Sequence, residues 1–379
     1  MPSTTSSPAS RRARCRLVAA TLLLTGLGGL AVPAGGSPAE PQPAPTAHAP
    51  EAAGAASDNP LAGRRMGVYK GPGELAWAPY VNATGRKKKL LGKIALRPKA
   101  RWFGAWTGSP KEIGAKVRDH IQNSTGGDPE VLSQMTVYRM VPWQQEAKER
   151  LPTRKERRQY KRWIRNFAAA TGDAHAAIIL QPDGPFALMA PGGSRVYSRL
   201  IAYAARMFAE LPNAATYIDA GASDWPKDDP ETAAELLVRA GVEHVRGFAL
   251  NVTHYTSTDE NIAHGTKVVA ELERRGIPDR HFVVSTSENG QPFNFNDYRG
   301  SHPNNAKVCE TRDERVCVTL GIPPTTKVAD ERWGLTDANR TRARRHVDAY
   351  LWIGRPWLVM QSAPFSRKRA LAMARTTPY

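Results

Sequence analysis

The chain has 379 residues, of which 41% are hydrophobic, and its formal net charge is +18 at pH 7. A length of this order accommodates one large α/β domain. The positive charge suits acidic polymers or a cell envelope. However, the basic residues fall in dispersed clusters without a zinc-finger, helix-turn-helix or RNA-binding motif, so we expect no nucleic-acid partner.

The first 60 residues predict export. Arg11–Arg16 is basic, and Leu17–Val32 is apolar but, at 16 residues, short for a membrane span. We therefore predict a signal peptide over residues 1–36, a disordered Pro/Ala-rich linker over 37–60, and one domain over 61–379. The mature protein is expected to be secreted, with no stable membrane insertion after removal of the signal, and monomeric.

From residue 100 onward, β-rich segments alternate with helical ones. Residues 64–100 are expected to be rich in loops, with a solvated turn at 86–89. The predicted strands cover 100–104, 134–141, 176–180, 215–219, 245–252, 281–286 and 348–353. The predicted helices cover 109–123, 152–170, 194–211, 230–240, 259–275 and 365–375, and 287–345 is expected to be a long loop.

This alternation indicates βαβ units and a parallel sheet. Seven strands predict the α/β class, with a distorted seven-stranded parallel β/α barrel that is TIM-like and forms a single domain. The chain has no GxGxxG after its first strand, no Walker loop and no GxSxG elbow. These absences argue against a dinucleotide-binding domain, a nucleotidase and an α/β-hydrolase.

Three cysteines are present, and Cys15 lies within the predicted signal peptide. Cys309 and Cys317 have seven residues between them in a polar segment. In an exported protein this pair predicts a local disulfide, the alternative being two free thiols. No Cys/His spacing typical of a metal site is found, so we expect neither a metal nor an organic cofactor.

Asp183 follows the apolar run Ala176–Leu180 within the sequence QPDG. Active sites of α/β barrels lie at the C-terminal ends of the strands. A carboxylic acid beside apolar walls is poorly solvated, which raises its pKa and suits it to be a general acid. Pro-Asp-Gly is also a common turn sequence, so a purely structural role is the alternative.

The other strand ends are rich in aromatic, amide and carboxyl side chains, a composition typical of sugar-binding sites. They include Trp102, Trp106, Tyr138, Gln144, Glu146, Asp219, Ser223, Trp225, Asn251, Tyr255, Thr286, Glu288, Asn289, Trp352 and Trp357.

Several of these segments resemble glycoside hydrolase family 6, the inverting cellulases. The matching segments, in the order of the family, are ARWFG (100–104), QPDG (181–184), YIDAGASDW (217–225), GFALNVTHY (247–255), FVVSTSENG (282–290), GIPPTT (321–326) and DAYLWI (348–353). The resemblance implies a distorted seven-stranded barrel that hydrolyses a β-glucan-type polysaccharide. It also implies that Asp183 is the proton donor. Positions that shape or bind the sugar subsites are Trp102, Tyr138, Asp219, Trp225 and Asn251.

The sequence departs from the family pattern where the catalytic base is expected. The family's YDLPDRDC is YRMVPWQQ at 138–145, which puts Gln144 in place of a supporting aspartate. The family's WxKPxGExDG is WIGRPWLVMQ at 352–361. Gly354 therefore replaces a lysine, Leu358 replaces a glutamate, and the proposed base falls on Val359 or Met360. Further replacements are Ala222 for a histidine, Ser285 for an aspartate and Glu288 for an arginine.

An inverting hydrolase needs an acid and a base about 6.5–9.5 Å apart. Three alternatives follow from the missing base. Another carboxylate activates water, with Glu288 favoured over Glu146, Asp297 and Asp219, although Glu288 also fits a surface salt bridge. Or the enzyme is slow and relies on a chain of waters. Or the domain is a non-catalytic glycan-binding protein. We expect a secreted glycoside hydrolase with Asp183 as acid and a non-standard base.

Overall fold

The computed structural model describes residues 59–226, 229–302 and 305–379. The predicted signal peptide (1–36) and the predicted linker as far as residue 58 lie outside the described residues. The boundaries at residues 36 and 60 therefore stay predictions. Among the helices that are described, none combines the length and the apolar character that a membrane crossing requires.

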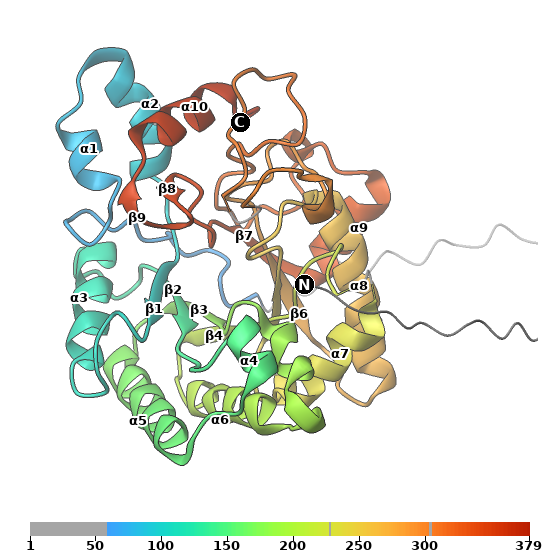
Figure 1. The fold of residues 1–379 in the computed structure, drawn as a ribbon. Coiled ribbons are helices and arrows are strands. Elements are labelled where there is room, and N and C mark those ends of the chain that lie inside the picture. Colours follow the sequence, from blue (N-terminus) through green and yellow to red (C-terminus); the bar gives the residue numbers. More distant parts are fainter. Residues whose placement is uncertain (1–58, 227–228, 303–304) are drawn as a thin grey trace, which may run out of the picture. The chain divides into compact units, whose positions relative to one another are not determined.

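The centre of the domain is a curled sheet of seven parallel strands, in which each strand pairs with the next one in the chain (Figure 1). The strands are β1 (Arg101–Gly104), β2 (Ser133–Tyr138), β3 (Ala176–Leu180), β4 (Ala214–Asp219), β5 (Gly247–Leu250), β6 (His281–Ser285) and β7 (Val347–Leu351). All five residues of β3 are buried, as expected for a strand covered on both faces. The predicted α/β barrel is confirmed.

The two edge strands meet through contacts at their ends. The backbone N–H of Ala100 donates to the carbonyl of Trp352 at 2.9 Å, and the indole N–H of Trp102 donates to the carbonyl of Ile353 at 2.7 Å. Small and branched side chains fill the interior of the curled sheet, among them Ala177, Ile179 and Val283. The interior of the sheet is therefore a packed core with no room for a ligand, and a ligand can bind only at the ends of the strands.

Helices cover the outside of the sheet (Figure 1). The predicted ones form α3 (Ile113–Thr125), α5 (Arg154–Thr171), α6 (Val196–Ala209), α7 (Pro230–Arg239), α8 (Thr258–Arg274) and α10 (Arg367–Thr376). Helix α5 illustrates why. Its side chains Tyr160, Trp163 and Phe167 recur at helical spacing and are buried, and Thr153 and Glu156 form a capping box at its start.

The structure differs from the sequence prediction in five places. Helix α2 (Gly85–Ala95) includes the predicted turn at 86–89, because Leu91 and Ile94 at its end are buried. Helix α9 (Asp337–His346) lies in the predicted loop; it has no broad apolar stripe and is anchored by Asn339, whose amide donates to Asp259 at 2.6 Å. Short helices α1 (Trp77–Val81) and α4 (Gln145–Glu149) and the hairpin of β8 (Leu358–Val359) and β9 (Ser362–Phe365) were also not predicted.

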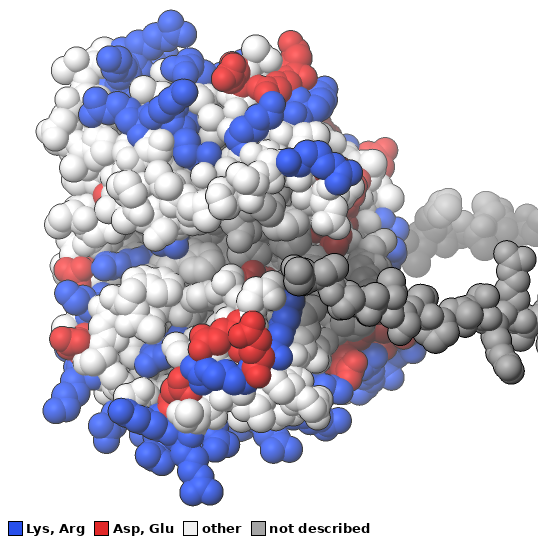
Figure 2. Space-filling model, in the orientation of Figure 1, with Lys and Arg blue, Asp and Glu red and all other residues white. Residues whose placement is uncertain are grey.

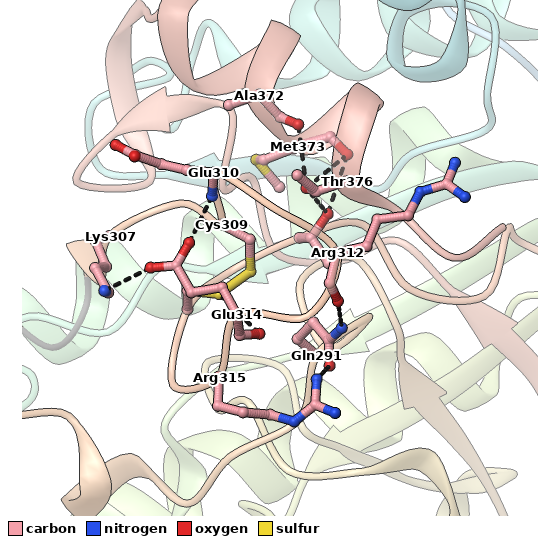
Figure 3. The surroundings of a disulfide bond; sticks show 12 residues. Gln291, Lys307, Cys309, Glu310, Arg312, Glu314, Arg315, Ala372, Met373 and Thr376 are labelled. Carbon is pink, nitrogen blue, oxygen red and sulfur yellow. Dashed lines mark hydrogen bonds and ion pairs between the residues drawn. A yellow bond between two sulfur atoms is a disulfide. The ribbon is translucent and has the colours of Figure 1, made fainter.

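The predicted disulfide between Cys309 and Cys317 is present, with an S–S distance of 2.04 Å. Figure 3 shows the loop that it closes. There the carboxylate of Glu314 accepts hydrogen bonds from the Lys307 ammonium and the Glu310 backbone N–H, both at 2.6 Å. The disulfide and these hydrogen bonds therefore stabilise a polar loop beside α10.

Candidate active site

Three cavities follow one another across the C-terminal ends of the strands, with volumes of about 360, 270 and 470 Å³. The first and second share Trp102, Trp106 and Arg355. The second and third share Gln144, Asp183 and Thr253. Figure 2 shows the corresponding hollow across this face, lined mostly by uncharged side chains. The three cavities therefore form one cleft, long enough for several units of a polymer.

Asp183 lies where the second and third cavities meet, directly after β3. Its backbone is left-handed (φ 61°), a conformation that Asp tolerates better than most residues. One carboxylate oxygen, Oδ2, accepts from the Gln144 amide at 2.7 Å and from the Tyr138 hydroxyl at 3.4 Å. The other, Oδ1, accepts from the Thr253 hydroxyl at 3.0 Å. The carboxyl group is thus held in one orientation toward the cleft.

Aromatic rings form the wall on one side of Asp183. Trp102 and Trp106 both pack against Tyr138, with ring centroids 5.4 and 5.9 Å apart. Burial, followed by the charge of Asp183, raises the pKa of the Tyr138 hydroxyl, so this group stays a neutral donor. Trp106 is 61% exposed, which leaves its ring free to stack on a sugar. The guanidinium of Arg355 lies 4.9 Å from the Trp102 ring and already occupies one of its faces.

The third cavity is lined by Phe186, Trp225, His254 and Phe295. His254 stacks on Trp225 at 5.4 Å, and its Nδ1 lies 2.7 Å from a carboxylate oxygen of Asp224. This His–Asp pair fixes the orientation of the imidazole. Its ring completes an aromatic floor next to Asp183.

Two predicted sugar-binding residues lie behind the cleft wall and do not line the three cavities. The side chain of Asn251 is fully buried and donates to the backbone carbonyls of Thr256 and Ser285. Asp219 is also fully buried, and its Oδ2 accepts from the backbone N–H of Gly184 at 3.3 Å. Burial, followed by the charge of Asp183, raises the pKa of Asp219 well above its usual value. Both residues therefore shape the loops around Asp183 from behind.

Glu288, the favoured base, is also behind the wall. It is 1% exposed, its Oε2 accepts from the Gln361 amide at 2.7 Å, and its Oε1 has no hydrogen-bond partner. Burial raises its pKa to about 8. Gln361 lines the second cavity and separates Glu288 from it. Glu288 is therefore no surface salt bridge, and it reaches the cleft only through Gln361.

The same carboxyl group explains why position 354 is a glycine. A Cβ at Gly354 would lie 2.5 Å from Glu288 Oε1 and 2.8 Å from Ser287 Oγ. A lysine, which the family pattern has here, does not fit while Glu288 keeps this position. The two departures from the pattern thus lie against one another.

The remaining candidate bases point elsewhere. Glu146 forms an ion pair with Arg150 at 2.8 Å, and the exposed Asp297 accepts from the backbone of Asn294 at 3.1 Å. Of the carboxylates in the described residues, Glu74 and Asp183 alone line the three cavities. Within the same residues, no group of three His, Cys, Asp or Glu side chains gathers where it could hold a metal ion.

Sequence reasoning did not assign several residues that line the cleft. Thr253 and His254 belong to the GFALNVTHY segment, of which only Asn251 and Tyr255 were named as candidates. Arg355 and Gln361 fall in the segment that departs most from the family pattern. Their signal was the replacement itself, because a cluster of changed residues in one strand-end segment marks an altered site.

Comparisons with known proteins give consistent findings. A family model described as glycosyl hydrolases family 6 matches residues 74–357. Endoglucanase 1 of Streptomyces halstedii is 32% identical over 233 residues, which are 60% of this chain and 70% of that protein. Endoglucanase A of Cellulomonas fimi is 29% identical over 228 residues, 60% of this chain and 48% of that protein. The chain thus spans about half to 70% of the length of these relatives.

Among solved structures, the endoglucanase Cel6 from Mycobacterium tuberculosis, in complex with a thio-linked cellobioside, has a TM-score of 0.66 and 26% identity. The similarity covers 84% of this chain and 99% of that one. A family 6 enzyme of Orpinomyces has a TM-score of 0.64 at 17% identity, over 85% of this chain and 98% of that one, which supports the fold.

Proposed function

The chain belongs to glycosyl hydrolases family 6, and from this membership we propose that it is a secreted enzyme that cleaves a β-glucan-type polysaccharide with inversion. The observation that carries the proposal is the place of Asp183. It is a carboxyl group at the middle of an aromatic-walled cleft, with hydrogen bonds from three side chains. Matched endoglucanases support the substrate class.

In the proposed reaction, Asp183 donates its proton to the glycosidic oxygen as the bond to the anomeric carbon breaks. Gln144 suits both states of Asp183. Its amide donates to the carboxylate, and a half turn of that amide presents an oxygen that accepts the carboxylic proton. Trp106 supplies an exposed apolar face on which a sugar ring would stack, and Trp102 and Trp225 line the same cleft.

The water that attacks the anomeric carbon needs a proton acceptor. We assign this role to Glu288, a buried carboxyl group directly behind the cavity wall, which receives the proton through a water admitted when the Gln361 side chain moves aside. A carboxylic acid with a pKa of about 8 is a strong base once it has ionised. The reaction needs Glu288 ionised and the general acid protonated at the same time. Near pH 8, where Glu288 ionises, few carboxylic acids keep a proton, so turnover is expected to be slow.

A second candidate function is glycan binding without cleavage. It is favoured by one observation: Asp183 has no second carboxylate facing it across the described part of the cleft. An inverting mechanism normally requires two.

One experiment separates the two functions. The purified protein is incubated with a panel of β-glucans and envelope polysaccharides, and both new reducing ends and binding affinities are measured. New reducing ends from the parent, but not from Asp183→Asn, support the hydrolase and identify its substrate. Binding to one glycan with no product over days supports the binding protein.

A further inference from the structure

A second groove on the surface is lined by cations. It has a volume of about 500 Å³ and lies between the start of α3 and the outer face of α5. Six of its nine lining residues are basic and none is acidic, namely Lys111, Lys155, Arg158, Lys161, Arg162 and Arg165. Figure 2 shows Lys and Arg gathered along the lower edge of the molecule, where Figure 1 places α5.

These cations are not neutralised by the protein. None of the six forms an ion pair with a carboxylate in the described residues. Two of them contact Tyr203, whose hydroxyl accepts from Arg165 at 3.1 Å and whose ring lies 5.0 Å from the Lys161 ammonium. The acidic residue of α5, Glu156, is already paired with Arg150.

The arrangement destabilises the helix that carries it. Arg158 and Arg162, and likewise Lys161 and Arg165, are four residues apart on α5, and like charges at this spacing repel one another. At some other places on the surface a carboxylate lies beside a cation, as at Arg239 with Glu235 and at Arg340 with Asp337. Unrelieved repulsion in one groove indicates that an external anion completes it.

The groove is continuous in sequence with the end of the cleft. Trp106 and Thr107 line the cleft, and Ser109, Pro110 and Lys111 line the groove. Helix α5 holds this connecting loop, since Trp163 donates to the carbonyl of Gly108 at 3.2 Å and Asn166 to that of Pro110 at 2.6 Å. The cavity lined by Trp106 and Thr107 also has Arg101, Lys116 and one carboxylate, Glu74, in its wall. A polymer that leaves the cleft at Trp106 toward Pro110 would therefore meet the cations of the groove.

We propose that the α5 groove is a secondary binding site for an anionic polysaccharide with carboxylate groups repeated along its chain, which the cleft also engages. The proposal rests on the proposed function for the identity of the polymer. Successive turns of α5 present a cation about every 5.4 Å, which suits a linear polymer with regularly spaced charges. No aromatic side chain lines the groove, whereas sites for single-stranded nucleic acid stack bases on aromatic rings.

The test compares two triple variants of equal charge. Lys155→Gln/Arg158→Gln/Arg162→Gln removes three cations from the groove, and Gln preserves helix propensity. Arg86→Gln/Lys87→Gln/Lys89→Gln removes three exposed cations from α2 as the control. The probes are a carboxymethylated β-glucan, the unmodified β-glucan of the same length and a single-stranded oligonucleotide. Hydrolysis of a short neutral oligosaccharide is followed in parallel.

We expect the parent to bind the carboxymethylated glucan at least about ten-fold more tightly than the neutral one at about 50 mM salt, and to lose this preference near 500 mM. The groove variant should lose the preference, the α2 variant should keep it, and both should cleave the neutral oligosaccharide as the parent does. Equal losses in the two variants, no preference in the parent, or tighter binding of the oligonucleotide would each overturn the proposal.

Two controls separate the possible causes of a negative result. If the groove variant does not fold, as judged by its melting temperature, Lys111→Gln repeats the test from the opposite wall, outside α5. If the parent cleaves no oligosaccharide but prefers the carboxymethylated glucan, the proposed hydrolase fails while the groove stands. If the parent cleaves the oligosaccharide but lacks that preference, the groove fails while the hydrolase stands.

Discussion

The two carboxyl groups on which the proposed mechanism depends have contrasting surroundings. Asp183 is open to the cleft and receives hydrogen bonds from three side chains. Glu288 is walled off by Gln361, has one donor, and keeps one oxygen without a partner. Burial favours the neutral form of the Glu288 carboxyl group. The proposed acid thus lies in the wall of the cleft, while the proposed base is a carboxyl group buried behind that wall.

The difference is local, because the loops that carry these groups are positioned by the same sheet. Asp183 follows β3, and Glu288 follows β6. In the segment after β7, Gly354 makes room for Glu288 and Gln361 closes the wall. On the other side, Gln144 replaces the supporting aspartate of the family pattern beside Asp183.

The largest expected effect is on turnover. Glu288→Gln removes the proposed proton acceptor but preserves its size, so the rate of glycan cleavage should fall at least about 100-fold. Added azide, a small nucleophile, should restore part of the rate. Unchanged turnover with retained binding would show that Glu288 only positions Gln361.

The same variant should change how stability depends on pH. The pKa of Glu288 is raised from 4.5 to about 8, so between these values the folded chain holds a proton that the unfolded chain has lost. The stabilisation present below pH 4.5 is therefore lost as the pH rises toward 8. Relative to the parent, Glu288→Gln should gain up to about 1.4 kcal/mol of unfolding free energy per pH unit in this window.

Urea unfolding of both proteins at pH 5, 6, 7 and 8 measures this change. At each pH the unfolding free energy of the parent is subtracted from that of the variant. This removes the contributions of the other buried acids, including Asp219, because both proteins share them. A constant difference across the series would mean that Glu288 titrates at an ordinary pH.

Filling position 354 tests the packing around Glu288. Gly354→Ala places a methyl group against Glu288 Oε1 and should cost about 1–3 kcal/mol of stability. In a Glu288→Ala background the same change should cost less, because the opposing carboxyl group is gone. Gly92→Ala in α2, where the nearest atom is 3.4 Å away, serves as a control and should be tolerated. If Gly354→Ala lowers the stability equally in both backgrounds, contact with the Glu288 carboxyl group is not the cause.

The smallest effect is expected on the acid side. Gln144→Asp puts a second carboxylate beside Asp183, and like charges at this distance favour a shared proton. The limb of the pH–rate profile that reports Asp183 should move up by about one pH unit. Gln145→Asp adds the same charge one residue along, without a hydrogen bond to Asp183, and should leave the limb in place. Identical shifts in the two variants would show a general charge effect.

The sequence predicted those features that depend on short-range pattern. Apolar runs such as Ala176–Leu180 identified the seven strands, and the position of Asp183 after one of them predicted its place at the strand ends. Helix α9 escaped prediction because its mean hydropathy is low and its anchor, Asp259, is 80 residues from Asn339. Contacts between residues far apart in the sequence, like that of Asn339 with Asp259, also determine which residues line the cleft.

Asn251 and Glu288 show this limit most clearly. Both stand at strand ends, where side chains either face the cleft or support the loops behind it. The direction follows from partners such as Ser285 and Gln361, which lie 34 and 73 residues away. Residue type and spacing cannot distinguish the two outcomes, because amides and carboxylates serve both.

The most direct test of Asp183 as the general acid compares two substrates. One is an unactivated oligosaccharide, whose leaving group needs a proton, and the other is an aryl glycoside whose leaving group departs without one. We predict that Asp183→Asn loses at least about 100-fold in kcat/KM on the first and only a few-fold on the second. Equal losses on both substrates, or no loss on either, would contradict the assignment of Asp183 as the acid.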